Sequence, residues 1–421
     1  MATKVRSLLI TALFFFLLFT PLAPALAAGE DISVYIDGMP VVFDVKPVLY
    51  NSRTLVPFRA LAEALDIQVT WDGQTRTVSA SKDGDTIRLQ IDSTTAYHNS
   101  AAVELEAPPL LINGRTLIPL RFFSETLGCK VQWAEATRSV KIVSPPEAMT
   151  VLGFYALGDS ATSSWKGLFK KQYPNTETGN TDIVSTVALG WYSLDKEGSL
   201  LTKSRTGWQR PEDWEKVLEA AKKYSLKTEM VVHLTDGDGT LTALLADKGA
   251  REKAAKEIAG EAKSYNGVNL DFEGLGLKEQ GEELTAVRSS FSAFVSQLAS
   301  QLKPMGKSLT LSLHPPNSAY RGYDYRSLGE LADTIVIMAY DYGIKPEPVT
   351  QVLQAVEMAR ASVPANKLVL GISAPGETAE SVIAEVGIAK RYGLSGVALW
   401  RLGLVPGDLW EALRTTILVK K

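Results

Sequence analysis

The sequence contains very little cysteine and histidine, and neither sign of charge is in large excess. A single cysteine, Cys129, among 421 residues excludes an intramolecular disulfide framework. The three histidines, His98, His233 and His314, lie too far apart in the sequence to form a zinc-binding motif, so we expect neither a metal nor a cofactor. With 47 acidic against 44 basic side chains, the composition argues against a nucleic-acid-binding protein.

Long apolar runs are also scarce, and the longest lies at the N-terminus. Lys4 and Arg6 precede an apolar run over residues 8–18, and Ala25-Leu26-Ala27 follows two prolines. This order predicts a secretory signal peptide at residues 1–27, because the run is shorter than the roughly 20 residues of a membrane-spanning helix. We expect a bacterial protein that is secreted or associated with the cell wall or spore envelope, with no transmembrane anchor after cleavage.

An internal repeat follows the signal peptide. Residues 51–78 and 113–140 share thirteen identical residues at a constant offset of 62 positions. In each copy, apolar residues at i, i+3, i+4 and i+7 predict a short helix, and alternating apolar residues then predict a strand. Because neither copy could bury its apolar face alone, we expect both to form one small α+β domain at residues 30–144.

This repeat resembles the copper amine oxidase N-terminal-like domain, or stalk domain, of exported Gram-positive proteins. The resemblance depends on the paired R-T-L-[VI]-P-[FL]-R and W-x₄-R segments. It implies a noncatalytic module that binds no copper and leaves open an association with the cell wall. Arg59 and Arg121 could bind an anionic wall polymer, but ion pairs or solvated charges beside Glu63 and Glu125 are the simpler interpretation.

After Pro145-Pro146 the pattern changes to apolar strands that alternate with amphipathic helices. The candidate strands are residues 151–155, 183–189, 228–234, 267–272, 308–314, 334–340, 367–373 and 396–400. Eight strands in roughly 270 residues predict an α/β fold, a (β/α)₈ TIM barrel at residues 148–421. The active site of such a barrel lies at the C-terminal ends of its strands.

The fourth candidate strand carries two carboxylates. Residues 267–273 read G-V-N-L-D-F-E, and the two-residue period directs Asn269, Asp271 and Glu273 into the barrel. Burial of two adjacent carboxylates is costly, and no cationic residue lies in this segment, so catalysis is favoured over an ion-paired strand end. Burial and repulsion from Asp271 predict a raised pKa for Glu273, which suits a general acid.

This strand is similar to the D-G-x-D-x-D-x-E segment of family 18 glycoside hydrolases, the chitinase-like enzymes. Residues 338–341 (M-A-Y-D) resemble the family's M-x-Y-D, residues 396–400 (G-V-A-L-W) resemble its G-x-x-x-W, and Phe154-Tyr155 ends the first strand. The branch most similar is that of the spore-cortex and cell-wall hydrolases. The resemblance implies retaining, substrate-assisted cleavage of β-1,4-linked N-acetylglucosamine polymers, which are peptidoglycan of the cell wall or spore cortex, or chitin.

The resemblance also assigns residue roles. Glu273 would protonate the glycosidic oxygen, Asp271 would hold the 2-acetamido N–H and stabilise the cyclic intermediate, and Tyr340 would donate to the acetamido oxygen. The implied substrate-binding residues are Tyr155, Asn269, Met338, Asp341 and Trp400.

Two departures from the family pattern accompany these matches. Asn269 stands where the family has its middle aspartate, so it cannot share a proton with Asp271. His233 lies where the family has S-x-G-G on the third strand, and we interpret it as a packed barrel residue. A noncatalytic, lectin-like carbohydrate-binding protein is the alternative function. We favour the enzyme because binding alone does not require the retained acid, Glu273.

Overall fold

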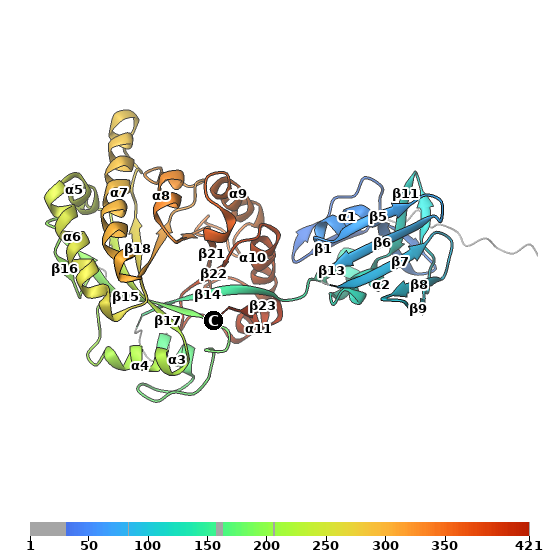
Figure 1. The fold of residues 1–421 in the computed structure, drawn as a ribbon, viewed down its shortest axis with the longest axis horizontal. Coiled ribbons are helices and arrows are strands. Elements are labelled where there is room, and N and C mark those ends of the chain that lie inside the picture. Colours follow the sequence, from blue (N-terminus) through green and yellow to red (C-terminus); the bar gives the residue numbers. More distant parts are fainter. Residues whose placement is uncertain (1–30, 83, 157–162, 205–206, 421) are drawn as a thin grey trace, which may run out of the picture.

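The computed structural model describes residues 31–82, 84–156, 163–204 and 207–420 (Figure 1). The predicted signal peptide, residues 1–27, lies outside the described residues. Within the described ranges, none of the helices is both long and apolar enough to cross a membrane.

The N-terminal region is a small sheet domain in which both sequence repeats share one core. Its strands are Ser33–Ile36 (β1), Met39–Pro40 (β2), Val48–Tyr50 (β3), Arg53–Pro57 (β4), Gln68–Asp72 (β5), Thr77–Lys82 (β6), Asp85–Gln90 (β7), Thr95–His98 (β8), Ala101–Glu104 (β9), Leu110–Ile112 (β10), Arg115–Pro119 (β11), Lys130–Ala134 (β12) and Ser139–Val143 (β13). The helices Phe58–Ala64 (α1) and Leu120–Thr126 (α2) follow β4 and β11.

Equivalent elements of the two repeats contact each other directly. Strands β4 and β11 pair antiparallel, with Val56 opposite Ile118. The rings of Phe58 and Phe123, one from each copy, meet edge to face with centroids 5.5 Å apart. Each copy therefore covers the apolar face that the other could not bury alone, as the repeat predicted. Arg121 forms an exposed ion pair with Glu125 at 3.0 Å, in agreement with the simpler interpretation of its charge.

The C-terminal region is the predicted closed barrel of eight parallel strands. These are Glu147–Tyr155 (β14), Thr186–Leu194 (β15), Lys227–Thr235 (β17), Gly267–Glu273 (β18), Ser308–Leu313 (β19), Thr334–Ile337 (β20), Leu368–Ser373 (β21) and Gly396–Trp400 (β22). Strand β14 pairs with both β15 and β22, which closes the sheet. Leu200–Leu201 (β16) and Ile417–Val419 (β23) extend it at β15 and β14. The second strand begins three residues later and ends five residues later than predicted.

Helices surround the barrel (Figure 1). They are Ser164–Phe169 (α3), Glu215–Lys223 (α4), Thr240–Ala246 (α5), Lys248–Glu261 (α6), Gly281–Leu302 (α7), Tyr325–Leu331 (α8), Val349–Arg360 (α9), Ala379–Arg391 (α10) and Gly407–Thr416 (α11). Inside the barrel, a second apolar cluster contains Leu152, Phe154, Ala188, Val231, Val336, Val369 and Ala398. Because apolar side chains fill this interior, polar side chains that point inward gather near the C-terminal strand ends.

The small domain packs against helix α10 of the barrel. Asp37, in the β1–β2 turn, accepts hydrogen bonds from the backbone N–H and hydroxyl of Ser144, at 2.8 and 2.6 Å. Lys390 on α10 donates to Ser144 Oγ at 3.1 Å and to the carbonyl of Pro145 at 3.0 Å. Met39 belongs to the apolar core that surrounds the barrel. The turn, the linker and α10 therefore form a continuous interface.

We expect Gly387→Ala to weaken this interface. An added Cβ at Gly387 would lie 2.4 Å from the Cβ of Asp37, although alanine is the better helix former by up to about 1 kcal/mol. The matched control is Gly260→Ala on α6, where nothing lies within 4 Å, so it should raise the melting temperature. Small-angle scattering and limited proteolysis at the linker would measure domain separation. Increased stability of the Gly387→Ala variant would contradict the interface.

Candidate active site

Strand β18 places its polar residues inside the barrel, as its alternation predicted. Val268, Leu270 and Phe272 belong to the core between the barrel and its helices. Asn269 is fully buried and Asp271 is 2% exposed, whereas Glu273, at the strand's C-terminal end, is partly exposed. The catalytic candidates Asp271 and Glu273 therefore share one face at the barrel mouth.

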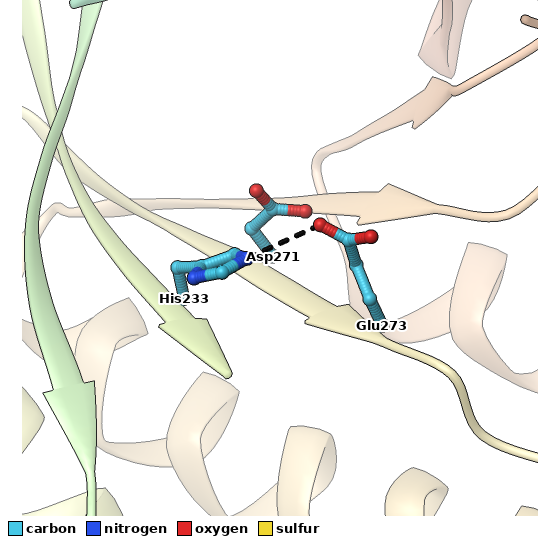
Figure 2. Close-up of side chains that lie close together, drawn as sticks. All are labelled: His233, Asp271 and Glu273. Atoms are coloured by element: carbon cyan, nitrogen blue, oxygen red, sulfur yellow. Dashed lines mark hydrogen bonds and ion pairs between the residues drawn. The ribbon is translucent and has the colours of Figure 1, made fainter. Parts of the chain in front are cut away.

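Two histidines flank Glu273. Strand β17 runs parallel to β18 with His233 opposite Asp271, and His233 Nε2 lies 3.2 Å from Glu273 Oε1 (Figure 2). His314 follows β19, and its Nε2 lies 3.8 Å from Glu273 Oε2. The interpretation of His233 as a packed barrel residue is therefore incomplete, because its ring contacts the candidate acid.

These contacts divide the two carboxyl groups electrostatically. Burial, followed by repulsion from Glu273, raises the pKa of Asp271 to about 7. Burial alone would raise the pKa of Glu273, but the hydrogen bond and charge of His233, with the charge of His314, lower it below its usual value. The predicted rise for Glu273 is wrong in the free protein, because its cationic partners come from neighbouring strands.

A cavity of about 560 Å³ opens over this pair. It is lined by the predicted residues Asp271, Glu273, Met338, Tyr340, Asp341 and Trp400, together with His314 and Tyr320. A second cavity of about 770 Å³ shares Glu273, His314 and Tyr320 and extends over the loop at residues 235–239. Open space therefore lies on both sides of Glu273.

Two predicted substrate-binding residues lie outside both cavities. Tyr155 is fully buried among the side chains between barrel and helices, with its ring 6.2 Å from that of Trp191. Its neighbour Phe154 faces the interior instead and meets Trp400 edge to face. The assignment of Tyr155 is corrected accordingly, because every residue of β14 from Val151 to Tyr155 is buried and the apolar pattern does not show which face each side chain takes.

Asn269 lies one position earlier than Asp271 on the inward face and is fully buried. Its amide donates to Glu229 at 3.1 Å and its oxygen accepts from Ser312 at 2.9 Å. Glu229 also accepts from Thr310 at 2.7 Å, and burial raises its pKa to about 7. Asn269 is therefore part of a buried polar network beneath the cavity rather than of the cavity wall, which corrects its assignment as a substrate-binding residue.

The loop after β20 is held by a carboxylate that sequence analysis missed. Glu347 accepts hydrogen bonds from the backbone N–H groups of Asp341 and Tyr342 and from Lys345. Asp341 has a φ of 63°, a conformation that non-glycine residues seldom adopt. The Glu347 carboxylate thus stabilises the backbone that presents Asp341 to the cavity.

Glu385 on α10 adds a third carboxyl group to this neighbourhood, and it predicts a pH effect. Burial, then the charges of Glu377 and Glu347, raises its pKa well above the usual value, and neither oxygen has a hydrogen-bond partner among the described residues. The folded protein therefore keeps a proton that the unfolded chain loses. The free energy of unfolding then falls by up to about 1.4 kcal/mol for each pH unit above the unfolded pKa.

We expect Glu385→Gln to remove this loss. The neutral amide could donate to Glu377 Oε2, which is buried and has no partner among the described residues. Its melting temperature should exceed that of the original protein at pH 8 and differ little at pH 5. Thermal melts at both values test this, with the exposed Glu380→Gln on the same helix as the matched control. Equal shifts at both pH values would contradict a buried, protonated Glu385.

Other site residues carried little sequence signal. Trp208 precedes α4 and stacks on Trp400, with centroids 5.4 Å apart and planes at 19°. It follows an irregular segment, so no periodicity marked it. His233 could have been found, because the alternation of β17 places it on the same face as Val231, which lies inside the barrel.

A β/α barrel with a buried Asp–Glu pair at its C-terminal strand ends, and a tryptophan beside them, has the architecture of a glycoside hydrolase. The chain belongs to the glycosyl hydrolases family 18, whose family model matches residues 162–387. It is therefore a glycoside hydrolase. The model of the copper amine oxidase N-terminal domain matches residues 35–142, which confirms the resemblance of the repeat.

Curated relatives are more distant. The chain is 27% identical over 219 residues to a Bacillus subtilis protein described as uncharacterized glycosylase YvbX, covering 48% of this chain and 60% of that protein. It is 28% identical over 140 residues to the cortical fragment-lytic enzyme of Bacillus subtilis, covering 30% of this chain and 31% of the enzyme. The match thus spans less than two thirds of either relative.

Solved structures share the fold. The spore cortex-lytic enzyme SleL of Bacillus cereus gives a TM-score of 0.53 at 15% identity, covering 66% of this chain and 76% of that one. A chitinase from Chromobacterium violaceum gives 0.52 at 21% identity, covering 64% and 98%.

Proposed function

We propose that this protein is an exported, retaining hydrolase of β-1,4-linked N-acetylglucosamine polymers, with peptidoglycan of the spore cortex or cell wall preferred over chitin. The observation that carries this proposal is the buried Asp271–Glu273 pair at a cavity that also contains Tyr340 and Trp400. The cortex-lytic relatives support peptidoglycan as the substrate. The predicted signal peptide supports export to the wall or spore envelope.

The proton required for catalysis begins on Asp271. In the free protein Asp271 has the raised pKa and Glu273 the lowered one. Asp271 must be ionised to accept a hydrogen bond from the substrate acetamido N–H, and Glu273 must be protonated to donate to the glycosidic oxygen. We infer that one proton passes from Asp271 to Glu273 when the sugar binds.

The 2-acetamido carbonyl then attacks the anomeric carbon while Glu273 protonates the departing oxygen. Tyr340 donates a hydrogen bond to the carbonyl oxygen, and ionised Asp271 stabilises the positive charge of the cyclic intermediate. Trp400 forms the floor under the sugar. Water, deprotonated by Glu273, opens the intermediate from the face that the leaving group vacated, so the anomeric configuration is retained.

The two cavities that meet at Glu273 support cleavage within a chain. A polymer lying across both would place sugars on each side of the acid, with His314 and Tyr320 at the junction. Their rings stack with centroids 3.9 Å apart, which gives the groove a rigid wall beside the scissile bond.

Digestion of purified spore cortex, vegetative wall and acetylated chitin oligosaccharides tests the proposal. We expect reducing N-acetylglucosamine ends, retained anomeric configuration and, early in the reaction, long rather than single-sugar products. Binding to these polymers without any new reducing ends would instead support the lectin-like alternative. Cleavage of chitin oligosaccharides without cleavage of either peptidoglycan would reverse the substrate preference.

A further inference from the structure

Three potential metal ligands converge at the barrel mouth. His233, Asp271 and Glu273 each offer one ligand atom, and these atoms all lie within 4.8 Å of one another (Figure 2). His233 Nε2 and Glu273 Oε1 are 3.2 Å apart. Two ligands at ~2.0–2.1 Å from a tetrahedral Zn²⁺ stand about 3.3–3.4 Å from each other. This pair is therefore already at the separation that the metal requires.

A second, independent observation concerns Asp271. Its side chain is 2% exposed, and Oδ1 has no hydrogen-bond partner among the described residues. A buried carboxylate oxygen without a partner is costly, because it has lost water and gained nothing in exchange. A cation bound between Asp271, Glu273 and His233 would satisfy this oxygen.

We propose that His233, Asp271 and Glu273 form a Zn²⁺ site whose occupation inhibits hydrolysis. One imidazole and two carboxylates suit Zn²⁺, whereas Mg²⁺ and Ca²⁺ prefer oxygen ligands alone. The adjoining cavity leaves room for water at the remaining position. The inhibition rests on the proposed function, because a metal on the carboxylate of Glu273 prevents that residue from carrying the catalytic proton and blocks the place of the acetamido group.

Direct metal binding tests the site without reference to activity. Calorimetric titration of the chelator-treated full chain with ZnCl₂ should show one Zn²⁺ bound, and Mg²⁺ at the same concentration should give no signal. His233→Gln should weaken Zn²⁺ binding at least tenfold. The matched control is His98→Gln, because His98 also contacts a carboxylate, Asp85 at 3.1 Å, but lies in the small domain. Asp271→Asn provides a second ligand variant, and thermal melts establish that each variant is folded.

The outcomes separate this inference from the proposed function. Absence of Zn²⁺ binding, or binding unchanged in both folded ligand variants, overturns the site. Loss of binding in His98→Gln would place the metal in the small domain and also overturns it. Zn²⁺ should abolish hydrolysis reversibly, with full recovery on adding a chelator; binding without inhibition overturns the regulatory step. A chelated protein that binds Zn²⁺ yet cleaves no polymer refutes the proposed function and leaves the metal site intact.

Discussion

Glu273→Gln is expected to lower turnover by about 10²–10⁴-fold while oligosaccharide binding changes by no more than a few-fold. The amide matches the carboxyl group in shape but cannot protonate the leaving oxygen. It can still accept a hydrogen bond from His233, so the contact across the barrel mouth is kept. Initial rates on a soluble acetylated oligosaccharide and calorimetric binding of the same ligand measure the two effects separately.

The matched control for this variant is Glu282→Gln. Glu282 is exposed in the first turn of α7, so the same change of charge occurs away from the cavity. Its turnover should equal that of the original protein. If Glu273→Gln also kept its turnover within a few-fold, Glu273 would have no role as the general acid, and another carboxyl group of the cavity, such as Asp341, would have to supply the proton.

Removal of the substrate's acetyl group is expected to have an effect of similar size. If the 2-acetamido carbonyl is the nucleophile, fully deacetylated polymer lacks the attacking atom and should be inert. A thiazoline mimic of the cyclic intermediate should inhibit strongly, because it resembles the state that the site stabilises. The protonated mimic is positively charged beside Asp271, so Asp271→Ala should weaken its binding much more than the binding of neutral oligosaccharide.

Rates on matched chitin and chitosan oligosaccharides, with inhibition constants for the mimic, test this mechanism. Asn269→Ala is an informative comparison, since Asn269 is buried beneath Asp271 and outside the cavity. It should affect the mimic and the neutral oligosaccharide equally. Comparable cleavage of chitosan, or indifference to the thiazoline, would instead indicate a direct carboxylate nucleophile.

The catalytic strand illustrates how far the sequence reaches. In β18 the two-residue period separates Val268, Leu270 and Phe272 from Asn269, Asp271 and Glu273, and the structure keeps this division. The prediction succeeded because each strand position has a fixed face and the two kinds of side chain differ strongly in polarity. In β14 both faces are apolar, so the same reasoning assigned Tyr155 to the wrong side of the barrel wall.

The sequence by itself determined the paired repeats, the eight barrel strands and the strand that carries Asp271 and Glu273, because periodic patterns are local and survive in one dimension. Only the tertiary structure decided which groups surround them. His233 is 40 positions from Glu273 in the sequence, and the parallel register of β17 and β18 brings them to 3.2 Å. Since electrostatic interactions depend on distance in space, that contact reversed the expected pKa shift of Glu273 and left the raised pKa on Asp271.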